Sequence, residues 1–309
     1  WAVLVTILDA VAFAILVRRG ASRARLAAGW FWAVFVLALG PIGIFRLDAI
    51  TVPIAAIGLL IAGSRPQVAG VLVGAATWIK VWPAALVVAL VVALRRRVDV
   101  IIGGVVVSAV IAAVVALAGG AEHLFGFVFT QSERGLQVES AAATPFLFGT
   151  AGATVYYDRE ILTYQVAGPG VDAVAAAMGP LMAAAVLAIC GLGIWRVRTG
   201  SPLVRVLPPL ALALVVALIV CNKVGSPQFQ SWLIAPLVAW IAWDRARAIG
   251  PAMLALVIAA LTHLVYPVIY HLVLQADIVA IAALAARNVL VVLLGAWAVA
   301  RLARTPTTL

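Results

Sequence analysis

Charged side chains are scarce in this chain of 309 residues: Asp, Glu, Lys and Arg make up only 10% of it, against about a quarter of a soluble globular domain. Hydrophobic residues make up 66% of the sequence, and the mean hydropathy is +1.20. This composition excludes a water-soluble enzyme and an intrinsically disordered chain. It predicts a protein that crosses a membrane several times.

Residue types that carry metal, redox and nucleotide chemistry are also few. The chain has 2 cysteines and 3 histidines, without the spacing of a metal site, and we interpret Cys190 and Cys221 as apolar packing residues. It contains neither a P-loop nor a Gly-x-Gly-x-x-Gly sequence. We therefore expect no metal site and no cofactor, and the sequence leaves open whether a divalent cation takes part.

Long apolar segments occupy most of the chain. Two of them, 67–79 and 83–94, are shorter than the roughly 20 residues of a full span, and are predicted to be either two short helices meeting at residues 80–83 or a re-entrant pair. The predicted fold class is all-α: a single membrane domain over 1–309, with about 11 transmembrane or re-entrant helices. The segments are 1–17, 29–45, 49–63, 67–79, 83–94, 99–118, 176–195, 203–221, 229–243, 251–271 and 277–300.

The net charge of +10 would suit a nucleic-acid-binding protein, but the basic residues lie in short clusters between apolar segments. Such clusters mark the cytoplasmic ends of transmembrane helices. Placing all of them inside makes the other connections alternate to the outer side. We therefore expect a multi-pass cell-membrane protein with a cytoplasmic C-terminus, a lipid-bilayer environment and no nucleic-acid partner. The clusters are Arg18–Arg25, Arg65, Arg95–Arg97, Arg196–Arg205, Arg245–Arg247 and Arg301–Arg304.

The longest connection, 119–175, is predicted to be a large extracytoplasmic loop. It carries a dense polar run from Ser132 to Ser140. Long polar loops on a rigid scaffold commonly carry function. The cytoplasmic side offers mainly arginines, which membrane topology explains, so we expect any site to face outward.

Four basic residues on the outer side are candidates for binding a phosphate group: Arg46, Lys80, Arg134 and Lys223. Lys80 and Lys223 are the only lysines in the chain, and both depart from the positive-inside trend. A compact ammonium group can match a phosphate as a point charge. The alternative is that these side chains extend to the outer headgroups, or that they belong to a solvated loop.

Polar residues close to these cations in the sequence are candidates for binding sugar or acceptor hydroxyls. Ser226 is also expected to cap the following helix, with Pro227 in its first turn. The alternatives are an interfacial anchor pair at Arg46 and Asp48, and incidental loop polarity elsewhere. The candidates are Asp48, Gln137, Glu139, Ser226 and Gln228.

Arg287 falls within the last apolar segment. An arginine at mid-membrane costs about 2.5–3.5 kcal/mol on insertion scales, so its side chain should face the protein interior. A buried structural pair, with Asp9 as the candidate partner, and a functional role are equally compatible with the sequence.

Three short motifs lie at the outer ends of apolar segments: Phe45–Asp48, then Gly70–Gly74 leading to Ile79–Pro83, then Asn222–Phe229 before Trp232–Leu233. Together they resemble glycosyltransferase family 87, a group of GT-C-fold enzymes that use polyprenyl-phosphate sugars. The likeness covers roughly residues 1–245. Its more specific parts are the lysine-to-proline step and the Lys-x-x-Ser-Pro-Gln turn.

The resemblance implies transfer of mannose, or arabinofuranose in some relatives, from a polyprenyl-phosphate donor to a cell-envelope glycolipid or glycan on the outer face. Enzymes of this fold normally carry their catalytic aspartate in the first outer loop, after the first helix. Residues 1–17 correspond to the second helix, so we expect the chain to lack that loop and leave the catalytic base unassigned. The alternatives are a transporter or flippase of an anionic polyprenyl lipid, and a non-catalytic membrane partner in envelope assembly.

Overall fold

Helices make up most of the computed structural model, which describes residues 1–18, 22–124, 126, 134–149 and 152–306. Six helical segments within these ranges are long and apolar enough to cross a membrane. The chain is therefore a helical membrane protein. Two residues of the predicted polar run, 132 and 133, lie outside the described residues.

Each predicted apolar segment coincides with a helix. The helices are α1 (Ala2–Leu16), α2 (Arg23–Leu39), α3 (Asp48–Ile61), α4 (Pro66–Ile79), α5 (Ala84–Ala93), α6 (Arg97–Leu117), α9 (Val171–Arg198), α10 (Leu203–Val220), α11 (Ile234–His263) and α13 (Ile278–Ala303). Shorter helical turns are η1 (Gly40–Gly43), η2 (Ala121–His123), η3 (Ala141–Ala143), α8 (Thr144–Leu147), η5 (Pro227–Leu233), η6 (Leu264–Val268) and α12 (Tyr270–Leu274).

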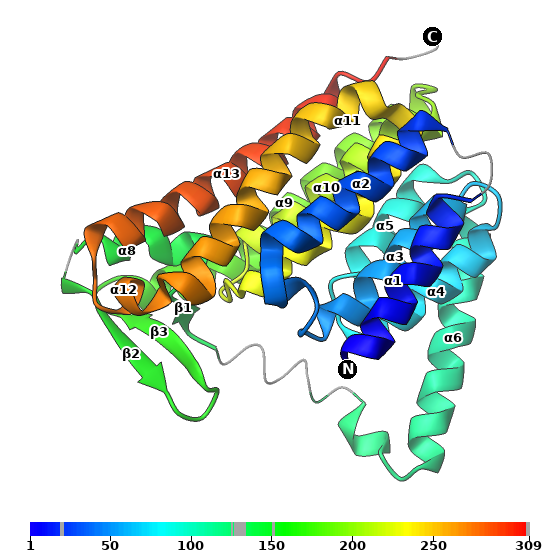
Figure 1. The fold of residues 1–309 in the computed structure, drawn as a ribbon. Coiled ribbons are helices and arrows are strands. Elements are labelled where there is room, and N and C mark those ends of the chain that lie inside the picture. The colour runs from blue at the N-terminus through cyan, green and yellow to red at the C-terminus, as the bar shows by residue number, and fades with distance from the viewer. Residues whose placement is uncertain (19–21, 125, 127–133, 150–151, 307–309) are drawn as a thin grey trace.

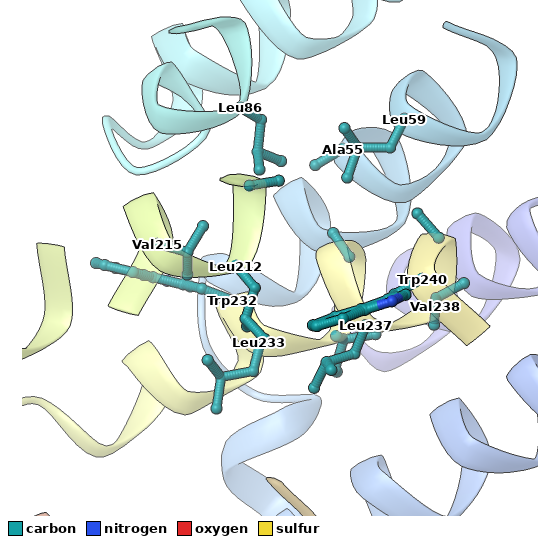
Figure 2. Packing of buried hydrophobic residues seen from close by; sticks show 14 of the residues in the cluster. Ala55, Leu59, Leu86, Leu212, Val215, Trp232, Leu233, Leu237, Val238 and Trp240 are labelled. Carbon is teal, nitrogen blue, oxygen red and sulfur yellow. The ribbon is translucent and has the colours of Figure 1, made fainter. Parts of the chain in front are cut away.

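Helix α10 forms the centre of the bundle, and its side chains are nearly all buried. It packs against α5, α9, α11 and α13, and leucines and valines of α10 and α11 interdigitate beside Trp240 (Figure 2). By contrast, α6 and α9 bury few of their apolar side chains. Exposed apolar surfaces of this extent suit contact with lipid.

Helices α4 and α6 approach each other closely through glycines. A Cβ added to Gly70 would lie 2.2 Å from the carbonyl oxygen of Val100, and one added to Gly103 would lie 2.2 Å from that of Gln67. Small residues at such crossings let helix backbones pack tightly within a membrane. The first glycine of the predicted Gly70–Gly74 motif therefore has a packing role.

Helix α11 doubles back on itself at Asp244. A straight helix of its 30 residues would be about 45 Å long. The turns that flank it, η5 and η6, however, both reach the corner between α2 and α3: Trp232 of η5 bonds to Asp48, and Tyr266 of η6 bonds to Arg46. Asp244 has non-helical backbone angles of φ −147° and ψ 66°. The reversal agrees with the prediction of separate segments at 229–243 and 251–271.

The long connection contains a small antiparallel sheet, which the all-α prediction missed. The strands β1 (Leu136–Gln137), β2 (Thr154–Asp158) and β3 (Thr163–Ala167) lie in the order β1-β3-β2. Val166 and Leu136 pack in a second hydrophobic cluster with Leu284 of α13. The short sheet therefore rests on the end of the helical bundle (Figure 1).

The segment before α6 and the long connection after it should be accessible from opposite sides of the membrane. In a background with Cys190 and Cys221 replaced by alanine, we expect Glu160→Cys, in the exposed β2–β3 turn, to react with a membrane-impermeant maleimide in intact cells. Arg95→Cys, just before α6, should react only after permeabilisation. Labelling of both positions from the same side would contradict this topology.

Candidate functional site

Asp48 is a buried carboxylate at the first turn of α3, with only 1% of its surface exposed. Its Oδ1 accepts a hydrogen bond of 2.6 Å from Nε1 of Trp232 in η5. Its Oδ2 is buried and has no hydrogen-bond partner among the described residues. Burying an unpaired carboxylate oxygen costs free energy. Nearby positive charge is therefore needed to stabilise the Asp48 carboxylate.

Lys80 and Arg46 supply that charge, since both interact electrostatically with the Asp48 carboxylate. Lys80 is the C-cap residue of α4, directly after Ile79, and Arg46 lies in the turn before α3. Arg46 also donates a 3.2 Å hydrogen bond from Nη2 to the hydroxyl of Tyr266. Three predicted site residues thus form one corner with two cations and one carboxylate.

Aromatic side chains fix the geometry of this corner. The rings of Trp82 and Trp232 stack at 5.6 Å with an interplanar angle of 8°, and Phe229 stacks on Trp232 at 4.2 Å. Trp82 Nε1 donates a 2.9 Å hydrogen bond to the hydroxyl of Thr51. The lysine-to-proline step and the Lys-x-x-Ser-Pro-Gln turn, which are far apart in sequence, therefore meet beside Asp48.

Glu139 is the centre of a second buried polar cluster, in the turn after β1. Its Oε2 accepts a 2.8 Å hydrogen bond from the side-chain amide of Gln137. The carbonyl of that amide accepts a bond from the backbone N–H of Gly225, while the backbone N–H of Gln137 donates to the carbonyl of Lys223. The connection between α6 and α9 and the Lys223 turn are therefore bonded directly to each other.

Gly225 is required for this contact. A Cβ at this position would lie 2.1 Å from both the carbonyl carbon of Glu139 and the backbone nitrogen of Ser140. A side chain cannot occupy this space without separating the two segments.

Arg287 joins the Glu139 cluster from α13. It is 3% exposed, and its Nη2 donates a 2.9 Å hydrogen bond to the backbone carbonyl of Glu139. Burial raises the pKa of Glu139, while the Arg287 charge and a hydrogen bond from Tyr270 act in the opposite direction. The expected inward orientation of Arg287 is confirmed, but its charged partner is Glu139, and the suggested partner Asp9 was wrong.

Two tyrosines connect the two clusters. Tyr266 bonds to Arg46, Tyr270 bonds to Glu139, and the two rings pack edge to face at 5.2 Å. Sequence reasoning missed both tyrosines. The available signal was their four-residue spacing, in a chain with only 5 tyrosines, within a segment interrupted by Pro267.

The remaining predicted residues lie nearby without completing either cluster. Ser226 stands at the N-cap of η5 and Pro227 at its start, but the predicted side-chain capping bond is absent. Gln228 is half-buried, and its backbone carbonyl accepts a hydrogen bond from the Ser231 hydroxyl. Arg134 is half-buried just before β1, with no hydrogen-bond partner for its Nε within the described ranges.

An apolar groove of about 400 Å³ adjoins the Glu139 cluster, between α8 and α13. Asn288 lines this groove and donates a 2.7 Å hydrogen bond to Thr144. The other lining residues are mainly apolar: Ala141, Pro145, Phe148, Ala285, Val289, Val292 and Leu293. An elongated apolar ligand and a polar headgroup could therefore be held side by side.

Within the part of the chain that the structure describes, no three His, Cys, Asp or Glu side chains gather as a metal-binding group. The chain matches no protein-family model, and comparisons with curated proteins and with solved structures find no match. The candidate site at Asp48 and Glu139 is therefore described from the contacts of its own residues.

Replacing Gly225 tests the contact between the two segments. We expect Gly225→Ala to lower the free energy of unfolding by about 3 kcal/mol or more, because the added methyl group meets backbone atoms that cannot rotate away. Thermal unfolding of the purified protein in detergent measures the effect. Gly104→Ala is the matched control, since a Cβ there meets nothing within 4 Å. Equal melting temperatures for the two variants would contradict the contact.

Proposed function

We propose that this protein is a membrane glycosyltransferase of the GT-C type. It transfers a sugar from a polyprenyl-phosphate donor to a cell-envelope glycolipid or glycan on the outer face. The observation that carries the proposal is the corner at Asp48, where two cations surround a buried carboxylate beside a stacked aromatic wall. Mannose is the first candidate sugar and arabinofuranose the second.

The leaving group of such a transfer is a lipid phosphate, whose negative charge grows as the glycosidic bond breaks. Cationic side chains fixed in advance stabilise this charge and lower the barrier. We assign this role to Arg46 and Lys80, and extend it to Lys223 and Arg134 on the adjoining turn and loop. The groove between α8 and α13 offers an apolar surface for the polyprenyl chain.

The polar residues around the cations have the chemistry to orient hydroxyl groups. We assign sugar or acceptor binding to the half-buried Ser226 and Gln228. Asp48, Gln137 and Glu139 are buried and hold the surrounding groups in place. An inverting transfer also needs a carboxylate that takes the proton of the acceptor hydroxyl. Asp48 and Glu139 are both buried, so we assign the base to neither.

Removing either lysine tests donor binding. We expect Lys80→Ala and Lys223→Ala each to lower sugar transfer from a labelled polyprenyl-phosphate donor by at least about tenfold, because a charge-assisted contact to phosphate is lost. Lys80→Arg should retain part of the activity. Arg65→Ala is the control, because Arg65 is exposed at the opposite end of the same helix, α4. Its transfer should equal that of the unaltered protein.

Equal melting temperatures ensure that the variants are compared as folded proteins. Normal transfer in both lysine-to-alanine variants would contradict the assignment. Movement of labelled polyprenyl lipid between leaflets, with no new glycosidic product, would replace the transferase with a flippase.

A further inference from the structure

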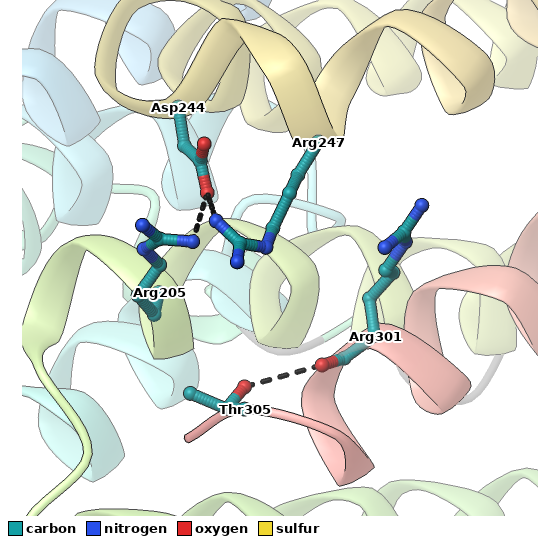
Figure 3. A network of polar contacts seen from close by, with 5 residues as sticks. All are labelled: Arg205, Asp244, Arg247, Arg301 and Thr305. Atoms are coloured by element: carbon teal, nitrogen blue, oxygen red, sulfur yellow. Dashed lines mark hydrogen bonds and ion pairs between the residues drawn. The ribbon is translucent and has the colours of Figure 1, made fainter. Parts of the chain in front are cut away.

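A basic pocket lies at the end of the bundle that we predict to be cytoplasmic. Three helices contribute arginines to it: Arg205 from α10, Arg247 from α11 and Arg301 from α13 (Figure 3). Arg304, just beyond α13, also lines the pocket. Asp244 is the acidic residue that lines it. Four guanidinium groups against one carboxylate leave the pocket with a net charge of +3.

Asp244 neutralises only part of this charge. The Nη1 atoms of Arg205 and Arg247 lie 3.2 Å and 3.3 Å from the same oxygen, Oδ2 of Asp244. Arg205 Nη1 is nevertheless buried without a hydrogen-bond partner in the described part of the chain. Neither Arg301 nor Arg304 forms an ion pair with a described residue. Arg301 and Arg304 therefore leave positive charge in the pocket for an anion.

The wall of the pocket is fixed by the end of the described chain. Arg196 donates a 3.2 Å hydrogen bond to the carbonyl of Thr305, and Ser201 donates a 3.1 Å bond to that of Pro306. The Thr305 hydroxyl in turn donates to the carbonyl of Arg301 (Figure 3). These bonds hold the arginine-bearing end of α13 against α9 and α10.

Membrane topology does not account for this arrangement. The positive-inside trend requires arginines on one side of the membrane, which separate, solvated side chains satisfy. Here arginines from three helices converge on a pocket of about 30 Å³ beside the buried Trp240. Gathering like charges is unfavourable unless an anion balances them.

We propose that this pocket binds a phosphate group, carried by an anionic lipid headgroup or by a soluble phosphate compound. Basic pockets between transmembrane helices at the cytoplasmic face are suited to phospholipid headgroups. The bound anion would link α10, α13 and the reversal of α11 at Asp244. This site is separate from the proposed transferase site on the outer face, and its test does not depend on transfer activity.

Thermal unfolding in lipid nanodiscs tests the proposal. Cardiolipin added to phosphatidylcholine nanodiscs should raise the melting temperature of the protein. Arg301→Gln with Arg304→Gln should weaken this response by about tenfold or more in lipid concentration, since each interfacial arginine contributes a factor of roughly five. Arg304→Gln alone, at an exposed position, gives a smaller loss without threatening the fold.

The control carries Arg95→Gln and Arg97→Gln, which remove two exposed arginines from the same predicted side but outside the pocket. It should respond like the unaltered protein. Asp244→Asn should strengthen the response, because it removes the competing negative charge; a purely structural aspartate would not do so.

A parallel titration with inorganic phosphate distinguishes the two sources. A shift with phosphate alone, abolished by the Arg301 and Arg304 changes, assigns the pocket to a soluble compound, and a shift with cardiolipin alone assigns it to a lipid. An unchanged response in the Arg301 and Arg304 double variant, or an equal loss in the control, would overturn the proposal.

Discussion

The hydrogen bond from Trp232 to the buried carboxylate of Asp48 is the interaction on which the proposed site depends. It joins residues 184 positions apart in the sequence and brings the turn after α10 against the start of α3. A buried carboxylate is stable only with donors and positive charge around it. That requirement accounts for the positions of Lys80 and Arg46 beside it.

Segments that are far apart in the sequence, namely the start of α3, η5 and η6, meet at one corner of the bundle. The reversal at Asp244 returns the chain to the end of the bundle that carries Asp48, where Tyr266 and Tyr270 connect Arg46 to the Glu139 cluster. The close approach of Gly225 then bonds the loop to the Lys223 turn. The buried charges of Asp48, Glu139 and Arg287 are thus collected into two connected clusters at one end of the molecule.

The helical part of this fold could be predicted from sequence, because long apolar segments separated by arginine clusters have few other solutions. The three-stranded sheet could not, since its strands of two to five residues carry exposed tyrosines and no long alternating pattern. Arg46, Asp48 and Lys80 were chosen as candidates for their charge in apolar surroundings, and the structure brings them together in one corner. Their partners Trp82, Trp232 and Tyr266 were not, because aromatic residues are common in membrane helices. Arg287 was correctly predicted to face inward, but its contact with Glu139 depends on tertiary packing.

The central claim is that the corner at Asp48 holds the phosphate of a polyprenyl-phosphate donor. Because Lys80 and Lys223 are the only lysines, selective ¹⁵N-lysine labelling gives two side-chain signals, which Lys80→Arg assigns. Solid-state NMR in liposomes can then measure dipolar coupling between these nitrogens and the ³¹P of bound polyprenyl-phosphate mannose. We predict strong coupling for both, as expected of direct ammonium–phosphate contacts. Absence of coupling at both lysines in a donor-saturated sample would contradict the account.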